Sequence, residues 1–341
     1  MKAPRITLLN PTCLDVLPLH RDWIGTLGVE FVANEAIRTL QLEQVDTIFE
    51  GADALILPAM IRSLPHAEHM ARHKSMKALS IAASGFDWLD LAAATRHGIV
   101  VTNAMPQEGI EVVADLTIGL MIAVARQIPH HHELLRNGNY QRGVGSSLWK
   151  KTLGIVGLGN IGKAVARRAR GFDMQVLAAT PNPDREFART FGVEIVPLDD
   201  LLRRADFVSL HVRLSDKTTG MIGKRELGLM KRTAFLVNAA REQLVDEDAA
   251  TDAVLNRRLA GLAMDDPPQR KDSPLFRLPN FVCTPHLGNR ALEGMNAVFR
   301  CAVENAVAAL RGERPGSLLN PEVYDVPHLR LQGMNVKPEL W

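Results

Sequence analysis

Residues 152–162 read Thr-Leu-Gly-Ile-Val-Gly-Leu-Gly-Asn-Ile-Gly, an apolar strand that runs directly into the pattern G-x-G-x-x-G and then into a helix. In such a loop Gly157 permits a tight turn and Gly159 lets the backbone approach a pyrophosphate. Gly162 lets the helix pack close to the strand. The stretch therefore predicts the first turn of a βαβ unit that binds a nucleotide.

The start of the helix supplies the second half of this argument. Free N–H groups around Asn160 and Ile161 are expected to face the phosphates, helped by the helix dipole. A glycine-rich turn without a ligand is the alternative interpretation. A following strand at Met174–Thr180 completes the unit and favours nucleotide binding.

Strand and helix patterns alternate along the whole chain, which is typical of α/β architecture with parallel sheets. The strands expected in the first part are Arg5–Leu9, Val29–Val32, Ala54–Leu57, Ala78–Ala82 and Val100–Val101. Those expected in the second part are Leu153–Val156, Gln175–Ala179, Glu194–Val196, Phe207–Leu210, Phe235–Asn238, Gly261–Ala263 and Phe281–Cys283. We predict two doubly wound parallel-sheet domains, Rossmann-like or flavodoxin-like.

Two long apolar helices predict that the domains are discontinuous in sequence. One, at about Glu108–Arg126, is expected to connect the domains, and the other, at about Leu292–Leu310, to carry the chain back to the first. We predict a substrate-binding domain from residues 1–103 with 290–330, and a dinucleotide-binding Rossmann domain from residues 104–289. A ligand is then expected in a cleft between them, at the carboxyl ends of the strands.

The composition is that of an ordinary globular protein. The chain has 341 residues, of which 46% are hydrophobic and 23% charged. A formal net charge of +2 gives no electrostatic basis for binding nucleic acid or an anionic membrane. The apolar run Val112–Ala125 is too short to span a bilayer. Three cysteines, few and odd in number, favour reduced thiols, so we expect a cytoplasmic protein.

Three histidines at helical spacing raise the question of a metal. His66, His69 and His73 recur at i, i+3 and i+7, with Glu68 nearby. A metal site and a solvated helix face both fit this spacing, and the solvated face is the commoner outcome. We therefore expect no metal.

Four further stretches carry a pattern beyond the glycine loop. They are Ser84-Gly85-Phe86-Asp87-Trp88-Leu89-Asp90-Leu91, Asn103 with Val113-Ala114-Asp115, Val237-Asn238-Ala239-Ala240-Arg241 with Val245-Asp246-Glu247-Asp248, and Thr284-Pro285-His286-Leu287-Gly288. In their order and approximate spacing they resemble the D-isomer-specific 2-hydroxyacid dehydrogenase family, over about residues 50–325. The resemblance implies hydride transfer between a nicotinamide ring and C2 of a small 2-keto or 2-hydroxy acid, and a homodimer.

The resemblance also implies a set of site residues that the chemistry itself requires. His286 matches the family histidine, the general acid in reduction and the base in oxidation. Arg241 is expected to bind the substrate carboxylate and the reacting oxygen. Backbone N–H groups of Ala83, Ser84 and Gly85 are expected to hold the other side of the carboxylate. The alternatives are a structural histidine, a surface arginine and a plain glycine turn.

The sequence departs from the family at the acidic partner and beside the arginine. The family usually has an Asp-Val-Phe-x-x-Glu-Pro-like stretch, and here the corresponding stretch is shorter and contains no Glu. We expect Asp266 to orient His286, with Asp265 as the second choice. Glu242 stands where the family usually has Gly. It can pair with Arg241, point away, or meet a positive group of an unusual substrate.

The remaining cofactor residues are expected where the strands of the nucleotide domain end. Besides Gly157, Gly159, Asn160, Ile161 and Gly162, they are Thr180, His211, Arg213, Ala239 and Asp265. NAD enzymes usually carry Asp or Glu at the position of Thr180. Because Thr180 is not a carboxylate, it would not repel a 2′-phosphate. No arginine cluster is placed to attract such a phosphate, although Arg185 is near. NAD and NADP both stay open, with NAD favoured by its frequency in the family.

Two functions of different classes fit these observations. The first is an NAD(P)-dependent oxidoreductase that interconverts a 2-keto acid and a D-2-hydroxy acid, with glyoxylate, hydroxypyruvate and larger 2-keto acids as candidate substrates. The second is a nucleotide-responsive regulatory protein, similar to a corepressor, with little turnover. The retained Arg241 and His286 favour the enzyme, because a sensor needs neither.

Overall fold

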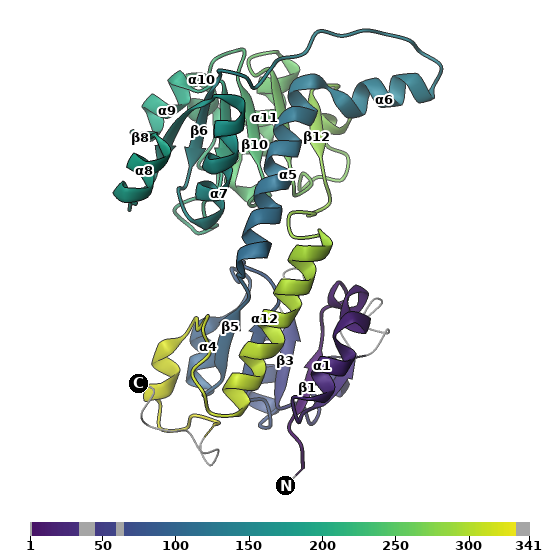
Figure 1. Cartoon of the computed structure of the whole chain (residues 1–341), viewed down its shortest axis with the longest axis vertical. Helices are drawn as coiled ribbons and strands as arrows, with labels where there is room; N and C mark the ends of the chain where they lie inside the picture. Colours follow the sequence, from purple (N-terminus) through teal and green to yellow (C-terminus); the bar gives the residue numbers. More distant parts are fainter. Residues whose placement is uncertain (1, 34–44, 59–64, 332–341) are drawn as a thin grey trace. The chain divides into compact units, whose positions relative to one another are not determined.

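The computed structural model describes residues 2–33, 45–58 and 65–331 (Figure 1). The chain separates into two compact units. The first takes in the chain up to Gly109 and from Leu292 onward, and the second comprises Ile110–Ala291. Each unit is built on one parallel sheet, and every strand expected from the sequence is present. The predicted α/β class is therefore confirmed, and the cleft between domains stays a prediction.

The first unit has a five-stranded sheet in the order β2-β1-β3-β4-β5. Its strands are β1 (Arg5–Leu8), β2 (Glu30–Ala33), β3 (Ala54–Leu57), β4 (Ala78–Ile81) and β5 (Val100–Asn103). Side chains alternate between the faces: Ile56 joins one buried core, and its neighbours Leu55 and Leu57 join another. Both faces are thus covered, as parallel sheets require.

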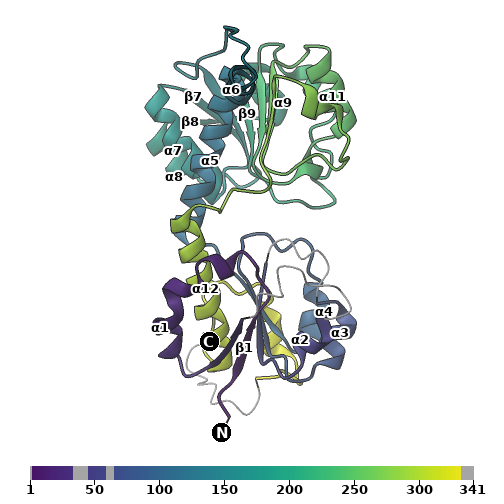
Figure 2. The ribbon, with the colours of Figure 1, turned by 90° about the vertical axis from the view of Figure 1, so that its right-hand side faces the viewer.

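Helices of the first unit lie on both sides of this sheet (Figure 2). The elements on one side are α1 (Arg21–Gly25) and α12 (Leu292–Leu310), and those on the other are α2 (Val45–Phe49), α3 (Ala67–Arg72) and α4 (Leu91–Arg96). Asp90 caps α4, because its carboxylate accepts the N–H of Ala93 at 2.8 Å. The helix therefore begins at Leu91.

The segment after α12 belongs to the same unit. Leu319 N–H donates to the carbonyl of Val101 at 2.9 Å. The buried Asn320 accepts the N–H of Val101 at 2.8 Å and donates to the carbonyl of Ile99 at 2.9 Å. These bonds attach the segment around η8 (Pro321–Asp325) to β5.

The second unit has a seven-stranded sheet in the order β12-β11-β10-β9-β6-β7-β8. Its strands are β6 (Thr152–Val156), β7 (Gln175–Ala179), β8 (Val193–Ile195), β9 (Phe207–Leu210), β10 (Phe235–Asn238), β11 (Gly261–Met264) and β12 (Phe281–Cys283). The chain runs outward from β6 to β8 and then returns to β9 on the other side of β6. The topological switch point, where ligands bind in open α/β sheets, therefore lies beside the glycine loop after β6.

Helices also cover both faces of the second sheet (Figure 2). They are α5 (Gln107–Arg126), α6 (Ile128–Arg136), α7 (Asn160–Ala169), α8 (Arg185–Phe191), α9 (Leu198–Arg204), α10 (Lys224–Leu229) and α11 (Glu247–Leu255). Glu111 and Asp115 of α5 both bond to Arg168 of α7, at 2.5 and 2.7 Å. Helices α9 to α11 share a core with the sheet that includes Leu201, Leu227 and Val254.

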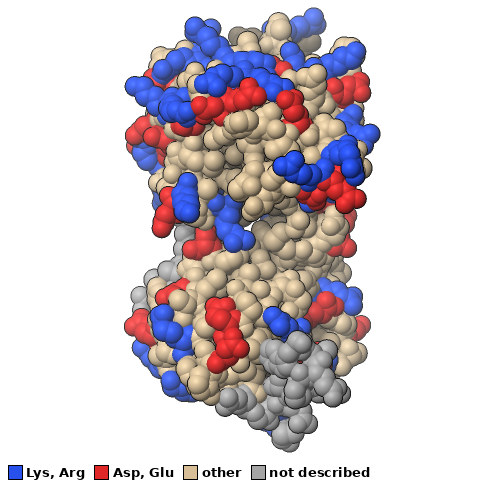
Figure 3. Space-filling model, turned by 90° about the vertical axis from the view of Figure 1, so that its left-hand side faces the viewer, with Lys and Arg blue, Asp and Glu red and all other residues tan. Residues whose placement is uncertain are grey.

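The surface carries charges of both signs. On the face drawn in Figure 3, Lys and Arg side chains are interspersed with Asp and Glu. Within the described ranges, no helix is both long and apolar enough to cross a membrane.

Candidate active site

The central contact of the candidate site joins two loops of the second unit. Nδ1 of His286 lies 2.7 Å from Oδ1 of Asp266. Asp266 follows β11 and His286 follows β12, and the register pairs Met264 of one strand with Cys283 of the other. Because the strands are parallel, both loops leave the same edge of the sheet. The structure therefore brings the predicted histidine to the first-choice acid.

The surroundings of His286 favour its charged form. The hydrogen bond that His286 donates to Asp266 raises the pKa of His286, while burial and the positive charge of Arg241 act in the opposite direction. The Asp266 side chain is only 8% exposed, so water does little to screen this contact. The imidazolium is thus stabilised by a carboxylate on one nitrogen.

The backbone at His286 adopts an uncommon conformation. Its φ is +55°, in the left-handed region that side-chain-bearing residues rarely occupy. Its N–H donates to the carbonyl of Asp265 at 2.7 Å, with a second acceptor at Thr284, 3.0 Å away. Strain of this kind persists only where surrounding contacts over-determine it, and such residues cluster at functional sites.

Asp265 supplies those surrounding contacts. Its carboxylate accepts hydrogen bonds from the hydroxyl of Thr284 at 2.6 Å and from the N–H groups of Leu287 and Gly288, both at 2.7 Å. Burial raises the pKa of Asp265, against these bonds. A Cβ at position 288 would lie 3.0 Å from Oδ2 of Asp265, so glycine suits that position. The two adjacent acids therefore divide their contacts, since Asp265 holds the loop and Asp266 contacts the imidazole.

The turn that carries Arg241 is closed by Asn238. The Asn238 side chain donates to the carbonyl of Arg241 at 2.7 Å and accepts the N–H of Ala240 at 3.1 Å. The guanidinium of Arg241 donates to the carbonyl of Ala240 at 2.8 Å. Arg241, Asp266 and His286 follow the parallel neighbours β10, β11 and β12, so the second unit places all three at one edge of its sheet.

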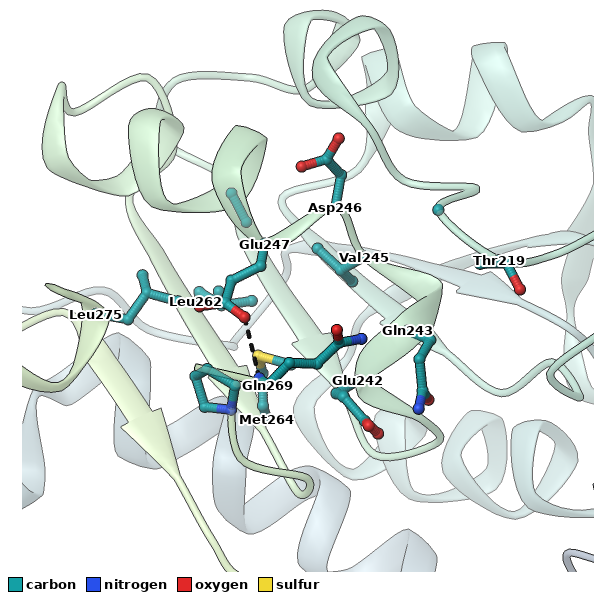
Figure 4. A pocket seen from close by; sticks show the side chains of 13 residues that line it. Thr219, Glu242, Gln243, Val245, Asp246, Glu247, Leu262, Met264, Gln269 and Leu275 are labelled. Carbon is teal, nitrogen blue, oxygen red and sulfur yellow. Dashed lines mark hydrogen bonds between the residues drawn. The ribbon is translucent and has the colours of Figure 1, made fainter. Parts of the chain in front are cut away.

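Glu242, the departure beside Arg241, lines a pocket of about 280 Å³ (Figure 4). Glu242 is 5% exposed and begins the short helix η6 (Glu242–Leu244). Gln243 lines the same pocket, and Leu262 and Met264 give it an apolar wall. Glu242 is thus a buried part of the fold and not a solvated surface acid.

The glycine loop has the shape that a pyrophosphate needs. Gly157 has a φ of +96°, and a Cβ there would lie 2.6 Å from the carbonyl oxygen of His211. A Cβ on Gly162 would collide with the carbonyl of Gly157. At Gly159 a Cβ would meet nothing within 4 Å, so open space faces the start of α7 at Asn160. These residues fit a dinucleotide, whose phosphates they would hold with backbone N–H groups.

The other expected cofactor residues lie at the carboxyl ends of neighbouring strands. Thr180 follows β7, Ala239 follows β10, and His211 and Arg213 follow β9. Nε2 of His211 lies 2.8 Å from Oγ of Ser209. Burial lowers the pKa of His211 to about 4, so this imidazole is neutral near pH 7.

The substrate-binding candidates belong to the first unit. Ala83, Ser84 and Gly85 follow β4, and the loop is tied to β5 by its carbonyls. The carbonyl of Ala83 accepts the N–H of Ala104 at 3.1 Å, and that of Ser84 accepts the side chain of Asn103 at 2.8 Å. Their convergence with Arg241 and His286 stays a prediction.

Comparison with known proteins identifies the chain. Residues 118–288 match the family model described as D-isomer specific 2-hydroxyacid dehydrogenase, NAD binding domain. A glyoxylate reductase of Korarchaeum cryptofilum is 38% identical over 81% of this chain and 85% of its own length. The chain belongs to the D-isomer specific 2-hydroxyacid dehydrogenase family. Its relatives are oxidoreductases that act on CH–OH donors.

Two further relatives extend this family assignment. A D-3-phosphoglycerate dehydrogenase of Methanocaldococcus jannaschii is 37% identical over 89% of this chain, and the match spans only 58% of that relative's length. The TT0316 protein of Thermus thermophilus has a crystal structure with a TM-score of 0.80, 33% identity, and coverage of 92% of this chain and 99% of that one. The two-sheet architecture is thus that of the family.

Sequence reasoning assigned no role to two residues of this family site. Asn238 closes the turn of Arg241, and Thr284 is bonded to Asp265. A polar amide at the end of the apolar segment Phe235–Asn238 was the available signal for Asn238. No comparable signal marks Thr284, because its partner comes from another strand.

Proposed function

We propose that the chain interconverts a 2-keto acid and a D-2-hydroxy acid, using a nicotinamide dinucleotide. The observation that carries the proposal is the contact between His286 and Asp266, at the edge of the sheet that also carries the glycine loop. Ketone reduction needs a proton as well as a hydride, and a histidine paired with a carboxylate is suited to deliver that proton near neutral pH.

Each residue of the site has a distinct part in this proposal. When bound by the glycine loop, a nicotinamide dinucleotide would supply the hydride for reduction at C2 and would accept it in oxidation. Because Nδ1 of His286 is bonded to Asp266, Nε2 is the atom that gives its proton to the carbonyl oxygen. In oxidation Nε2 takes the hydroxyl proton back. Arg241 holds the substrate carboxylate, and N–H groups of the Ala83–Gly85 loop hold its other side.

The cofactor and substrate follow from family evidence. NAD is the cofactor we favour, since the matching family model is an NAD-binding domain. Relatives are named glyoxylate reductase and D-3-phosphoglycerate dehydrogenase, so small 2-keto acids such as glyoxylate and hydroxypyruvate are the first substrates to test. In this scheme the unit ending at Gly109 binds the acid, and the unit containing β6 binds the dinucleotide.

We also propose that the chain works as a cytoplasmic homodimer. Helix α6 has no buried residue, and it and the following segment extend away from the sheet of their unit (Figure 1). Ile128, Leu135, Tyr140 and Val144 are exposed there. Exposed apolar side chains in one segment are a feature of protein interfaces, and a second copy is the partner that the family implies.

The regulatory alternative is separated from the enzyme by one assay. Purified protein is mixed with NADH or NADPH and a panel of 2-keto acids, and the absorbance of the reduced nicotinamide is followed. The proposal predicts oxidation of the nucleotide with at least one acid. Tight nucleotide binding without turnover of any acid would favour the regulatory protein.

A further inference from the structure

The loop after β7 contains one carboxylate, and it already has partners. Asp184 is the sole acid among residues 180–185. Its Oδ2 accepts the ammonium of Lys163 at 2.6 Å, and its Oδ1 accepts the N–H of Phe187 at 3.0 Å. The bond from Lys163 lowers the pKa of Asp184, so this carboxylate is charged at neutral pH. The opposite charges of Lys163 and Asp184 therefore neutralise each other.

This ion pair lies beside the glycine loop. Lys163 is on α7, and its N–H donates to the carbonyl of Gly159 at 2.8 Å. The N–H of Gly157 donates to the carbonyl of Ala179, the last residue of β7, at 2.9 Å. The pair therefore joins the phosphate-binding helix to the loop that begins at Thr180. In dinucleotide-binding Rossmann domains, this loop meets the adenosine ribose.

We propose that the Lys163–Asp184 ion pair sets the dinucleotide preference, by neutralising the acid that would select NAD and the base that would select NADP. The inference rests on the proposed dinucleotide site. An acid bonded to Lys163 neither binds the ribose 2′-hydroxyl well nor repels a 2′-phosphate. Thr180 is uncharged, and the exposed Arg185 adds a positive charge to the loop. The chain therefore accepts both dinucleotides, with affinities that differ by at most about tenfold, the scale of an exposed charge contact.

Three variants test the inference by binding alone. Dissociation constants for NADH, NADPH, 5′-AMP and 2′,5′-ADP are measured by calorimetry on the full chain. D184N removes the acidic partner of Lys163 and keeps a residue that can cap α8. The affinities for NADPH and 2′,5′-ADP should therefore rise about tenfold relative to those for NADH and 5′-AMP. T180D adds an acid at the end of β7 and should shift the ratio toward NADH. E194Q is the matched control, because it removes the charge of Glu194 on β8, which is paired with Arg204. It should leave the ratio of the NADH and NADPH affinities unchanged.

The outcomes separate this inference from the proposed function. A wild-type preference of more than about tenfold for either dinucleotide over the other would overturn the inference, as would D184N and E194Q having the same ratio. Binding ratios that behave as expected, in a protein that reduces no 2-keto acid, would overturn the enzymatic proposal and leave the inference standing. Failure to bind either dinucleotide would contradict both.

Discussion

Nδ1 of His286 and Oδ1 of Asp266 lie 2.7 Å apart, across the ends of the adjacent strands β11 and β12. The family usually places a Glu later in a longer loop. Here the acid follows β11 after a single intervening residue, Asp265. The Asp266 side chain, one methylene shorter than that of Glu, reaches the imidazole directly from this position.

Changing Asp266 to Asn should lower the pKa of His286, because the amide offers no charge to stabilise the imidazolium. Reduction requires protonated His286, so its activity is lost as pH rises through that pKa. The basic limb of kcat/KM for reduction should move to lower pH by about one to three units. Oxidation, which needs the neutral imidazole, should gain activity on its acidic side. Superimposable pH profiles of variant and wild type would show that Asp266 does not act on the histidine, and D272N is an exposed control.

Changing Asp265 to Asn should loosen the loop that holds His286. An amide can replace only one carboxylate oxygen as acceptor, so the N–H of Leu287 or Gly288 meets an NH₂ group. The expected loss of unfolding free energy is about 1–3 kcal/mol. The fall in kcat should exceed the change in nucleotide affinity, as measured by calorimetry. Equal losses in both would assign Asp265 to the nucleotide and not to the loop.

Two alanine substitutions in the glycine loop should fail in different ways. Gly159→Ala should fold normally, since its Cβ meets no atom within 4 Å. It should weaken dinucleotide binding, because the added methyl group occupies the open space expected to receive the phosphates. Gly162→Ala should lose about 1–3 kcal/mol of stability, since its Cβ collides with the carbonyl of Gly157. Thermal unfolding and nucleotide titration of both proteins give the comparison. Normal nucleotide affinity in Gly159→Ala would contradict the position of the phosphates.

The strands were predictable because parallel strands buried on both faces form continuous apolar runs, such as Ala54–Leu57 and Gly261–Met264. Register was not predictable. Whether Asp265 or Asp266 meets His286 depends on the pairing of Met264 with Cys283, which no local pattern encodes. The same holds for Lys163 and Asp184, which lie on different elements. Local sequence motifs were thus sufficient to locate the site. The partners of its residues depend on contacts between segments that are distant in the sequence.

Replacement of His286 tests the account most directly. His286→Ala removes the proton-carrying group, and His286→Asn does so with a residue that tolerates the left-handed backbone. Turnover of the best 2-keto acid and the dissociation constant of the dinucleotide are measured for both variants and the wild type. The account predicts a loss of about 10²–10⁴-fold in kcat with nearly unchanged nucleotide affinity. Retained turnover in His286→Asn, or a comparable loss of nucleotide binding, would contradict it.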